Sequence, residues 1–245
     1  MIGFRARLGF LLPPGNPTIE LEMMAMAAPG NLEGVSLHFH RMNAGGVPGA
    51  LHGQEERNRE MLASLPAAVT TLAQVKPDIV VIAHTATSYD LGREAEHALL
   101  AQLAKAGGTR VTTAFASVAA ALERLGVKRV AVGTPYSAET TQKGKAHLEA
   151  HGFTVVSHDN LKHAGNIYDT TAEQAYRLAR SVDAPEAEAV FLSGTGMPTV
   201  SVLEMLERDL QKPVISSNSA MMWLALRACG VNQPVTGYGR LLTLD

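Results

Sequence analysis

Short apolar runs alternate along this chain with longer amphipathic stretches, and turn residues separate the two kinds of segment. The apolar runs, each the length of a β-strand, lie at residues 8–12, 35–39, 79–83, 130–132, 154–157, 189–192 and 214–215. The stretches with helical periodicity lie at residues 18–28, 55–74, 93–106, 114–125, 138–150, 172–181 and 202–210. This alternation predicts parallel sheets whose strands are connected by crossover helices.

The two halves of the sequence repeat the same order of segments. Residues 7–14 and 129–136 each contain a basic residue, a strand and a proline turn, and residues 78–88 and 188–196 each contain an acidic residue, a strand and small polar residues. Duplication predicts two similar α/β lobes. Since ligands bind beyond the carboxyl ends of parallel strands, we expect four polar loops to face one another across a cleft. These loops lie around Asn16, Thr87, Tyr136 and Thr195.

Local signals refine the expected boundaries of the elements. Gly126 and Gly152 follow helical stretches at the position where glycine commonly ends a helix. Thr170 and Glu173 have the spacing of a capping box. The glycine-rich segment 45–49 predicts either a plain connector or a lid.

Charge and composition restrict the possible partners. The 21 Lys and Arg residues nearly balance the 23 Asp and Glu residues, giving a net charge of −2, so we expect neither nucleic-acid binding nor attraction to an anionic membrane. The apolar run at 79–83 is far shorter than the ~20 residues of a membrane-spanning helix. The apolar run at 8–12 is also too short for a signal peptide. We therefore expect a soluble, cytoplasmic protein.

Cysteine and histidine content limits disulfide and metal chemistry. The single cysteine, Cys229, excludes an internal disulfide, a CxxC pair and a multi-cysteine zinc site. His38 and His40 alternate on one strand face and could bind zinc with His52, although polar side chains on an edge strand are the simpler interpretation. The segment 147–151 has histidines at positions i and i+4 but is not HExxH, which favours a solvated helix end.

Nucleotide and hydrolase motifs do not account for the polar loops. The Gly194-Thr195-Gly196 segment lacks the third glycine of a dinucleotide fingerprint, and Ser193 does not lie in GxSxG. Instead, small neutral hydrogen-bonding residues recur after the strands in both halves. Such donors suit a carboxylate or an enolate oxygen, although Ser, Thr and Asn are also ordinary turn residues. This set consists of Asn16, Thr87, Ser88, Tyr136, Ser193, Thr195, Ser216, Ser217 and Asn218.

At these loops the sequence resembles the aspartate/glutamate racemase superfamily, most closely the branch of maleate cis-trans isomerases and arylmalonate decarboxylases. Segments that resemble family motifs occur in the family's order at 14–18, 83–88, 134–136, 192–199, 213–223 and 237–241. The resemblance implies a pseudo-symmetric two-lobed α/β fold, each lobe a mostly parallel sheet flanked by helices, with the active-site cleft between them. The lobes would comprise residues 1–113 plus 219–245, and residues 114–218.

The resemblance also implies roles for individual residues. Substrate carboxylate or enolate oxygens would be bound by Thr87, Ser88, Tyr136, Thr195 and Gly196, and the other carboxylate by Asn16 and Asn160. Ser193 and Asn218, from the set of small polar residues above, complete the expected substrate-binding residues. It implies no metal, no organic cofactor, and a homo-oligomer, either a dimer or a tetramer.

The chain departs from the family at the catalytic cysteines. By motif position, Ala86 and Gly194 occupy the places of the two facing cysteines, and Cys229 lies in the C-terminal helical pattern. Alanine and glycine cannot supply a nucleophilic thiolate. His84, with an ordinary pKa near ~6.5, is the first candidate for an alternative acid or base, and Tyr136 is the second.

Three hypotheses follow from this departure. The first is a cysteine-independent enzyme that acts on a small carboxylic or dicarboxylic acid through an enolate-like or oxyanion intermediate, by decarboxylation, hydration, elimination or hydrolysis. The second is a family member that binds a small acid without turning it over. The third is a maleate isomerase-like cis-trans isomerase in which other groups replace the cysteines.

Overall fold

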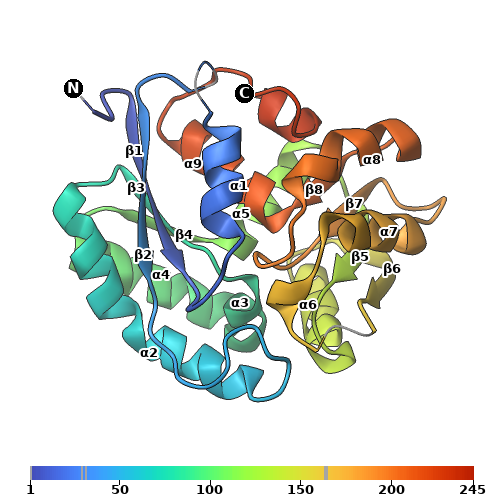
Figure 1. Cartoon of the computed structure of the whole chain (residues 1–245), viewed down its shortest axis with the longest axis horizontal. Helices are drawn as coiled ribbons and strands as arrows, with labels where there is room; N and C mark the ends of the chain where they lie inside the picture. Colours follow the sequence, from blue (N-terminus) through green and yellow to red (C-terminus); the bar gives the residue numbers. More distant parts are fainter. Residues whose placement is uncertain (1, 29, 31, 163–164) are drawn as a thin grey trace.

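The computed structural model describes residues 2–28, 30, 32–162 and 165–245 and contains two parallel four-stranded sheets side by side (Figure 1). The first sheet has the order β2-β1-β3-β4, and the second has the order β6-β5-β7-β8. The first consists of β1 (Ala6–Leu12), β2 (Val35–Arg41), β3 (Ile79–Ile82) and β4 (Arg110–Thr113). The second consists of β5 (Arg129–Thr134), β6 (Thr154–Asn160), β7 (Ala189–Leu192) and β8 (Val214–Ser216).

Helices connect the strands and cover the sheets. They are α1 (Ile19–Met26), α2 (Gln54–Leu72), α3 (Thr85–Leu91), α4 (Arg93–Gly107), α5 (Ala114–Arg124), α6 (Ala138–Ala150), α7 (Ala172–Val182), α8 (Leu203–Leu210) and α9 (Ser217–Ala228). Short 3-10 helices lie at Ala73–Val75, Ile167–Asp169, Val200–Val202 and Arg240–Thr243.

The pleat of the first sheet divides its apolar side chains between two cores. Phe10 belongs to the core that continues into the second lobe, whereas its neighbour Leu11 packs with α2 and α4 on the opposite face. Strand side chains alternate between the two faces of a sheet, so the continuous apolar run at 8–12 indicates burial on both faces. The equivalent strand order in both sheets confirms the predicted fold of two pseudo-symmetric α/β lobes.

The chain passes between the sheets at the helices α5 and α9, which pack against each other. Both helices begin with a side-chain cap: Thr113 accepts a hydrogen bond from the N–H of Ala116, and Ser216 forms a capping box with Ser219. The boundary between the strands of the first sheet and those of the second therefore lies between residues 113 and 129. The expected lobe boundaries at 113/114 and 218/219 agree with this division but stay a prediction.

Two of the local expectations were wrong in detail, and the expected glycine ends of two helices were confirmed. Thr87, expected in a loop, lies within α3, where buried contacts with both lobes outweigh the low helix propensity of Ser and Thr. The capping box before α7 uses Thr171 and Gln174 rather than Thr170 and Glu173. Gly126 and Gly152 do end helices, with φ of +71° and +84°.

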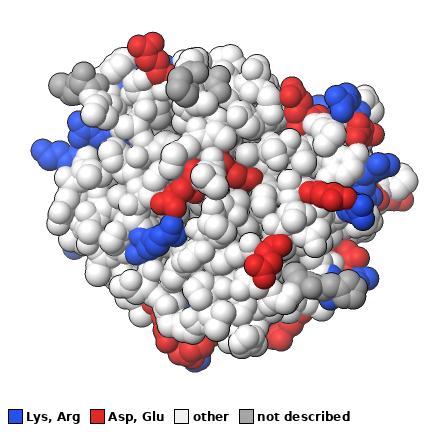
Figure 2. Space-filling view, viewed as in Figure 1, with Lys and Arg blue, Asp and Glu red and all other residues white. Residues whose placement is uncertain are grey.

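The surface agrees with the balanced charge. Lys, Arg, Asp and Glu are scattered among uncharged residues on the face shown in Figure 2. In the part of the chain that the structure describes, no helix has the length and apolar character needed to cross a membrane.

Candidate active site

A small cavity of about 30 Å³ lies beyond the carboxyl ends of β1 and β3. Both lobes contribute to its wall, since Ile167 and Tyr168 come from the second lobe. This volume has room for about one or two water molecules. The lining residues are Pro13, Pro14, Ala44, Gly45, Pro48, Gly49, Gln54, Arg57, Asn58, Met61, His84, Ile167 and Tyr168.

His84 is the predicted catalytic residue that lines this cavity. It is the N-cap residue of α3, and its Nδ1 is buried with no hydrogen-bond partner among the described residues. Burial, together with the nearby positive charge of Arg57, lowers the pKa of His84 to about 4, although the Asp90 carboxylate opposes the shift. The imidazole is therefore neutral at pH 7 and able to accept a proton.

Arg57 gives the cavity a positive charge that the sequence reasoning missed. It extends from α2 and donates to the carbonyl oxygens of His52 (2.8 Å) and Ala50. No carboxylate lies within ion-pair distance of its guanidinium in the described part of the chain. Its pKa is lowered by burial, but a guanidinium remains charged in proteins. The nearby phenol of Tyr168 stays protonated, because burial raises its pKa to about 12.

The segment 44–49 forms the roof of the cavity and docks on the second lobe. The N–H of Ile167 donates to the Gly49 carbonyl (2.7 Å), and the Asn166 side chain donates to the Pro48 carbonyl (2.8 Å). Gly49 has φ of +74°, and a Cβ there would lie 2.1 Å from Asn166 Oδ1, so this contact requires glycine. The glycine-rich segment therefore lines one side of the cavity, and its role as a lid or a plain connector stays a prediction.

Tyr136 and Ser193 lie in a second group, a buried hydroxyl cluster. Tyr89 and Ser193 share a hydrogen bond of 2.8 Å, and Thr85 donates to Ser217 at 2.9 Å, so the cluster draws on both lobes. Burial and the neighbouring Tyr89 raise the pKa of Tyr136, and contacts with hydroxyls lower it only partly. A phenol of this kind suits hydrogen-bond donation rather than proton abstraction at neutral pH.

Other predicted residues stabilise the backbone around these groups. Thr87 donates to the carbonyl oxygen of His84 (2.9 Å), and Asn160 donates to that of Tyr136 (2.7 Å). Asn16 accepts from the N–H groups of Thr18 and Ile19 at the start of α1. These bonds hold the polar turns in place, and direct contact of Thr87, Asn160 and Asn16 with a substrate stays a prediction.

A buried carboxylate that the sequence reasoning missed joins the lobes. Glu22 accepts from the backbone N–H of Val200 (2.9 Å) and from Asn218 Nδ2 (2.6 Å), and the same Asn218 amide donates to the Thr195 carbonyl (3.2 Å). Burial raises the pKa of Glu22, while these donors oppose the shift. Thr18 donates to the Gly196 carbonyl (2.8 Å), which adds a further cross-lobe bond.

Ser88 is not among the residues that line the cavity. Its hydroxyl donates to the buried carboxylate of Glu96 on α4 at 2.7 Å. The predicted contact between Ser88 and a substrate stays a prediction, but the structure gives this hydroxyl a different partner.

The two lobes place His84 and Gly194 at equivalent positions. The N–H of Ala83 donates to Leu11 on β1, and the N–H of Ser193 donates to Gly133 on β5, each at 2.8 Å. The residue that follows each donor is His84 in the first lobe and Gly194 in the second. Ala86 lies two residues further on, fully buried in α3. Its assignment to the first cysteine position therefore stays a prediction, and the symmetry favours His84 instead.

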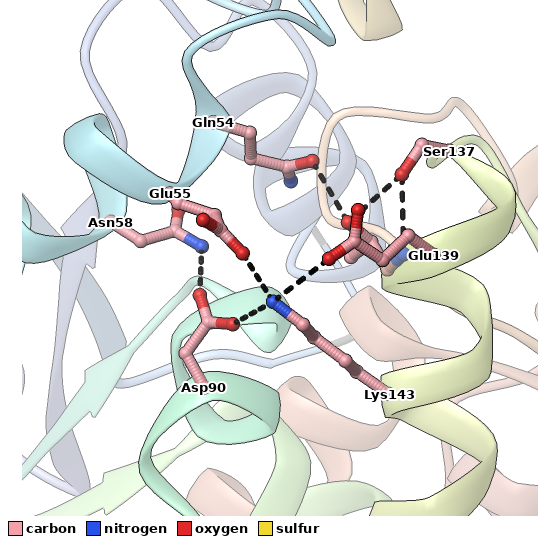
Figure 3. Close-up of polar contacts among 8 residues, drawn as sticks. Gln54, Glu55, Asn58, Asp90, Ser137, Glu139 and Lys143 are labelled. Atoms are coloured by element: carbon pink, nitrogen blue, oxygen red, sulfur yellow. Dashed lines mark hydrogen bonds and ion pairs between the residues drawn. The ribbon is translucent and has the colours of Figure 1, made fainter.

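A polar network beside the cavity links α2, α3 and α6 (Figure 3). Lys143 of α6 forms ion pairs with Glu55 and with Asp90 (3.3 Å). Asp90 also accepts from Asn58, a lining residue, at 2.6 Å. This network connects the second lobe to the wall of the cavity.

Comparison with known proteins places this architecture among named relatives. A sequence profile described as arylmalonate decarboxylase matches residues 8–242. The maleate isomerase of Nocardia farcinica is 30% identical over 98% of this chain and 96% of its own. The arylmalonate decarboxylase of Bordetella bronchiseptica is 30% identical over 66% of this chain and 70% of its own.

Solved structures agree with the sequence comparison. A cysteine-to-serine mutant of the Nocardia farcinica maleate cis-trans isomerase, with a covalently bound succinylcysteine intermediate, superposes with a TM-score of 0.88 and 28% identity, covering 98% of this chain and 99% of that one. The profile and the Nocardia farcinica enzyme match nearly the whole chain, so this chain is a member of the arylmalonate decarboxylase family.

Proposed function

We propose that this protein is a cysteine-independent enzyme that acts on a small carboxylic or dicarboxylic acid through an enolate-like intermediate. The observation that carries the proposal is that a neutral imidazole, His84, and a guanidinium without an ion pair, Arg57, line the same cavity. A lyase reaction fits this pairing best, by decarboxylation, hydration or elimination. The relatives support the same broad class of reaction, since they include a decarboxylase and isomerases.

The position of the only cysteine supports a route without a thiol. Cys229 is the C-cap residue of α9, and its Sγ lies 3.7 Å from the guanidinium of Arg110, the first residue of β4. The candidate cavity lies beyond the opposite, carboxyl ends of the strands. Burial raises the pKa of this thiol, with Arg110 opposing the shift, so the thiolate is disfavoured at neutral pH.

The chemistry of the proposed site follows from its charges. Arg57 binds one substrate carboxylate, since its fork of donors matches that geometry. Neutral His84 removes a proton from the substrate or from water, and the negative charge of the bound acid raises its pKa toward neutrality. In an elimination, the resulting imidazolium gives this proton to the leaving hydroxide, which departs as water and leaves a carbon–carbon double bond; hydration is the reverse. In a decarboxylation, the enolate forms by loss of CO₂ and takes its proton from the imidazolium, while the hydroxide left from water combines with CO₂ as bicarbonate. Hydrogen-bond donors fixed before the reaction, including the Tyr168 phenol, stabilise the developing negative charge.

Turnover of a panel of acids tests the proposal. The wild-type protein is incubated in D₂O with substituted malonates, maleate, fumarate and hydroxy acids, and products and α-carbon deuteration are followed by NMR. We expect conversion of at least one acid by the wild type and by Cys229→Ala. Loss of activity in a folded Cys229→Ala variant would contradict the proposal, and tight binding of an acid without product would favour a non-catalytic binding protein.

Removal of the Arg57 charge tests substrate recognition. We expect Arg57→Met to raise KM by roughly 10- to 100-fold, because a charge-assisted hydrogen bond contributes ~1.5–3 kcal/mol. Arg59→Met is the matched control, since Arg59 lies on the same helix but is exposed and pairs with Glu56. Equal KM values for the two variants would exclude Arg57 as the carboxylate anchor.

A further inference from the structure

Three potential metal ligands meet between the lobes, away from the candidate cavity. Glu96 comes from α4 of the first lobe, His147 lies in the last turn of α6 in the second lobe, and His151 is the C-cap residue of that helix. One ligand atom of each residue lies within 4.8 Å of the other two. No other triad of this kind is found in the part of the chain that the structure describes, so His38, His40 and His52 do not form the zinc site considered from sequence.

Glu96 is a buried carboxylate with one oxygen already oriented. Ser88 and Thr113 both donate hydroxyl hydrogen bonds to Oε1. Burial alone would raise the pKa of Glu96, but contacts with His147, Thr113 and Ser88 outweigh it and lower the pKa. The second oxygen, Oε2, lies 3.7 Å from His147 Nε2, which is too far for a good hydrogen bond.

His147 presents a buried ring nitrogen that lacks a partner. Its side chain is only 4% exposed, although the sequence favoured a solvated helix end. Its Nε2 has no hydrogen-bond partner among the residues described. The ring packs edge-on against Phe115, with centroids 4.2 Å apart, which fixes its orientation. A buried polar atom without a partner is costly, and this one points at a carboxylate oxygen.

His151 connects the cluster to solvent. Its Nδ1 lies 2.8 Å from the His147 carbonyl and can donate to it, which leaves Nε2 with a free lone pair. His151 and Glu96 also line an open pocket of about 580 Å³, together with Arg93, Glu94 and His97. A small ion can therefore reach the buried ligands from this side.

We propose that Glu96, His147 and His151 bind a divalent transition-metal ion of the Zn²⁺ type that ties α4 to α6 across the lobes. Two imidazoles and a carboxylate form a ligand set that Zn²⁺ and Co²⁺ accept. Ligand atoms around tetrahedral zinc lie ~3.3 Å apart, so a small rotation of the half-exposed His151 completes the triad. The hydroxyls that donate to Glu96 and the His147 carbonyl that faces His151 Nδ1 act as the outer partners that orient metal ligands. The ion lies outside the cavity and takes no part in the proposed reaction.

Metal titration tests the site directly. Chelator-treated full-length protein is titrated with Zn²⁺ by calorimetry and with Co²⁺ by visible absorption, and Tm is measured with and without Zn²⁺. We expect one ion per chain and a Co²⁺ absorption spectrum typical of a low coordination number. We also expect a higher Tm with metal, because the ion binds only the folded state. Wild-type protein that binds no Zn²⁺ at micromolar concentrations would overturn the proposal.

Variants then locate the ion. His151→Ala is expected to fold, because this side chain is partly exposed, and to lose at least about 100-fold in Zn²⁺ affinity. His97→Ala is the matched control, since His97 lines the same pocket outside the triad, and it should bind Zn²⁺ like the wild type. Unchanged affinity in a folded His151→Ala variant, or an equal loss in His97→Ala, would overturn the assignment. Both readouts are independent of turnover.

Discussion

The two lobes share one strand order but differ sharply where β3 and β7 end. After β3, His84 caps a helix that begins at once, and its side chain lines the cavity. After β7, the equivalent residue is Gly194, with φ of +104° and its side-chain space filled by Pro135. The same scaffold position therefore carries a titratable group in one lobe and only backbone in the other. A site with one such group suits a reaction in which a single residue both takes up a proton and delivers it to the leaving group or to the enolate.

The strongest test of this asymmetry is removal of the imidazole. We expect His84→Ala to lower kcat/KM by roughly 10²- to 10⁴-fold on whichever acid the panel identifies, the usual contribution of a general acid–base group. Steady-state kinetics on the folded variant measure this change. His158→Ala, at an exposed position on β6, should retain wild-type kinetics. Comparable activity in the two variants would remove His84 from the reaction.

Adding a side chain at Gly194, the equivalent position in the second lobe, should lower the free energy of unfolding. In Gly194→Ala the new Cβ would lie 2.7 Å from Pro135 Cγ at a positive φ, so we expect strain of ~1–2 kcal/mol plus ~1–3 kcal/mol of overpacking. Denaturant unfolding measures the loss. Gly126→Ala, which has a positive φ but nothing within 4 Å, isolates the strain alone. Equal losses in the two variants would show that the space beside Gly194 is not filled.

The pH dependence separates a neutral base from a charged acid. Because the pKa of His84 in the free enzyme is lowered to about 4, its basic form predominates above pH 4. We expect kcat/KM to be constant near neutrality and to fall about tenfold per pH unit below pH 4. In His84→Gln the substrate still titrates but residue 84 does not, so the pH dependence of this variant is used to correct that of the wild type for substrate ionisation. A rate that instead increases as the pH falls from 7 would indicate that the protonated imidazole is required.

The smallest expected effect concerns the polar network between the lobes. Lys143→Met removes the ion pairs with Glu55 and Asp90, but all three side chains are in part exposed to solvent, which weakens such pairs. We expect Tm to fall by about one degree, and less at high salt. Lys145→Met, which breaks only a pair within α6, is the control. A large, salt-independent fall would show that this network determines how the lobes dock.

Much of the fold could be predicted from the sequence, because burial on both faces of a parallel strand leaves a continuous apolar run. β4 escaped prediction, since the four residues Arg110–Thr113 include three polar side chains at the edge of the sheet. α3 escaped because its small polar residues resemble a loop, and long-range contacts with both lobes bury them. Local sequence carries no record of such contacts.

The candidate site was predicted only in part, for a similar reason. His84 follows a buried strand, and that position was visible in the sequence. Arg57 resembles an ordinary surface residue of a charged helix, because its burial depends on the segment 44–49 crossing to the other lobe. Asn218 was expected to contact a substrate, but its amide is engaged by Glu22, a carboxylate 196 residues away.

The contact between Gly49 and Ile167 makes access to His84 a conformational event. The cavity has room for only a water molecule or two, so the proposed reaction requires the segment 44–49 to move away from the second lobe before an acid can bind. That movement would break the backbone hydrogen bond between Ile167 and Gly49. Under the proposed function, this opening would gate turnover, and the size of the opening would limit the size of the acid.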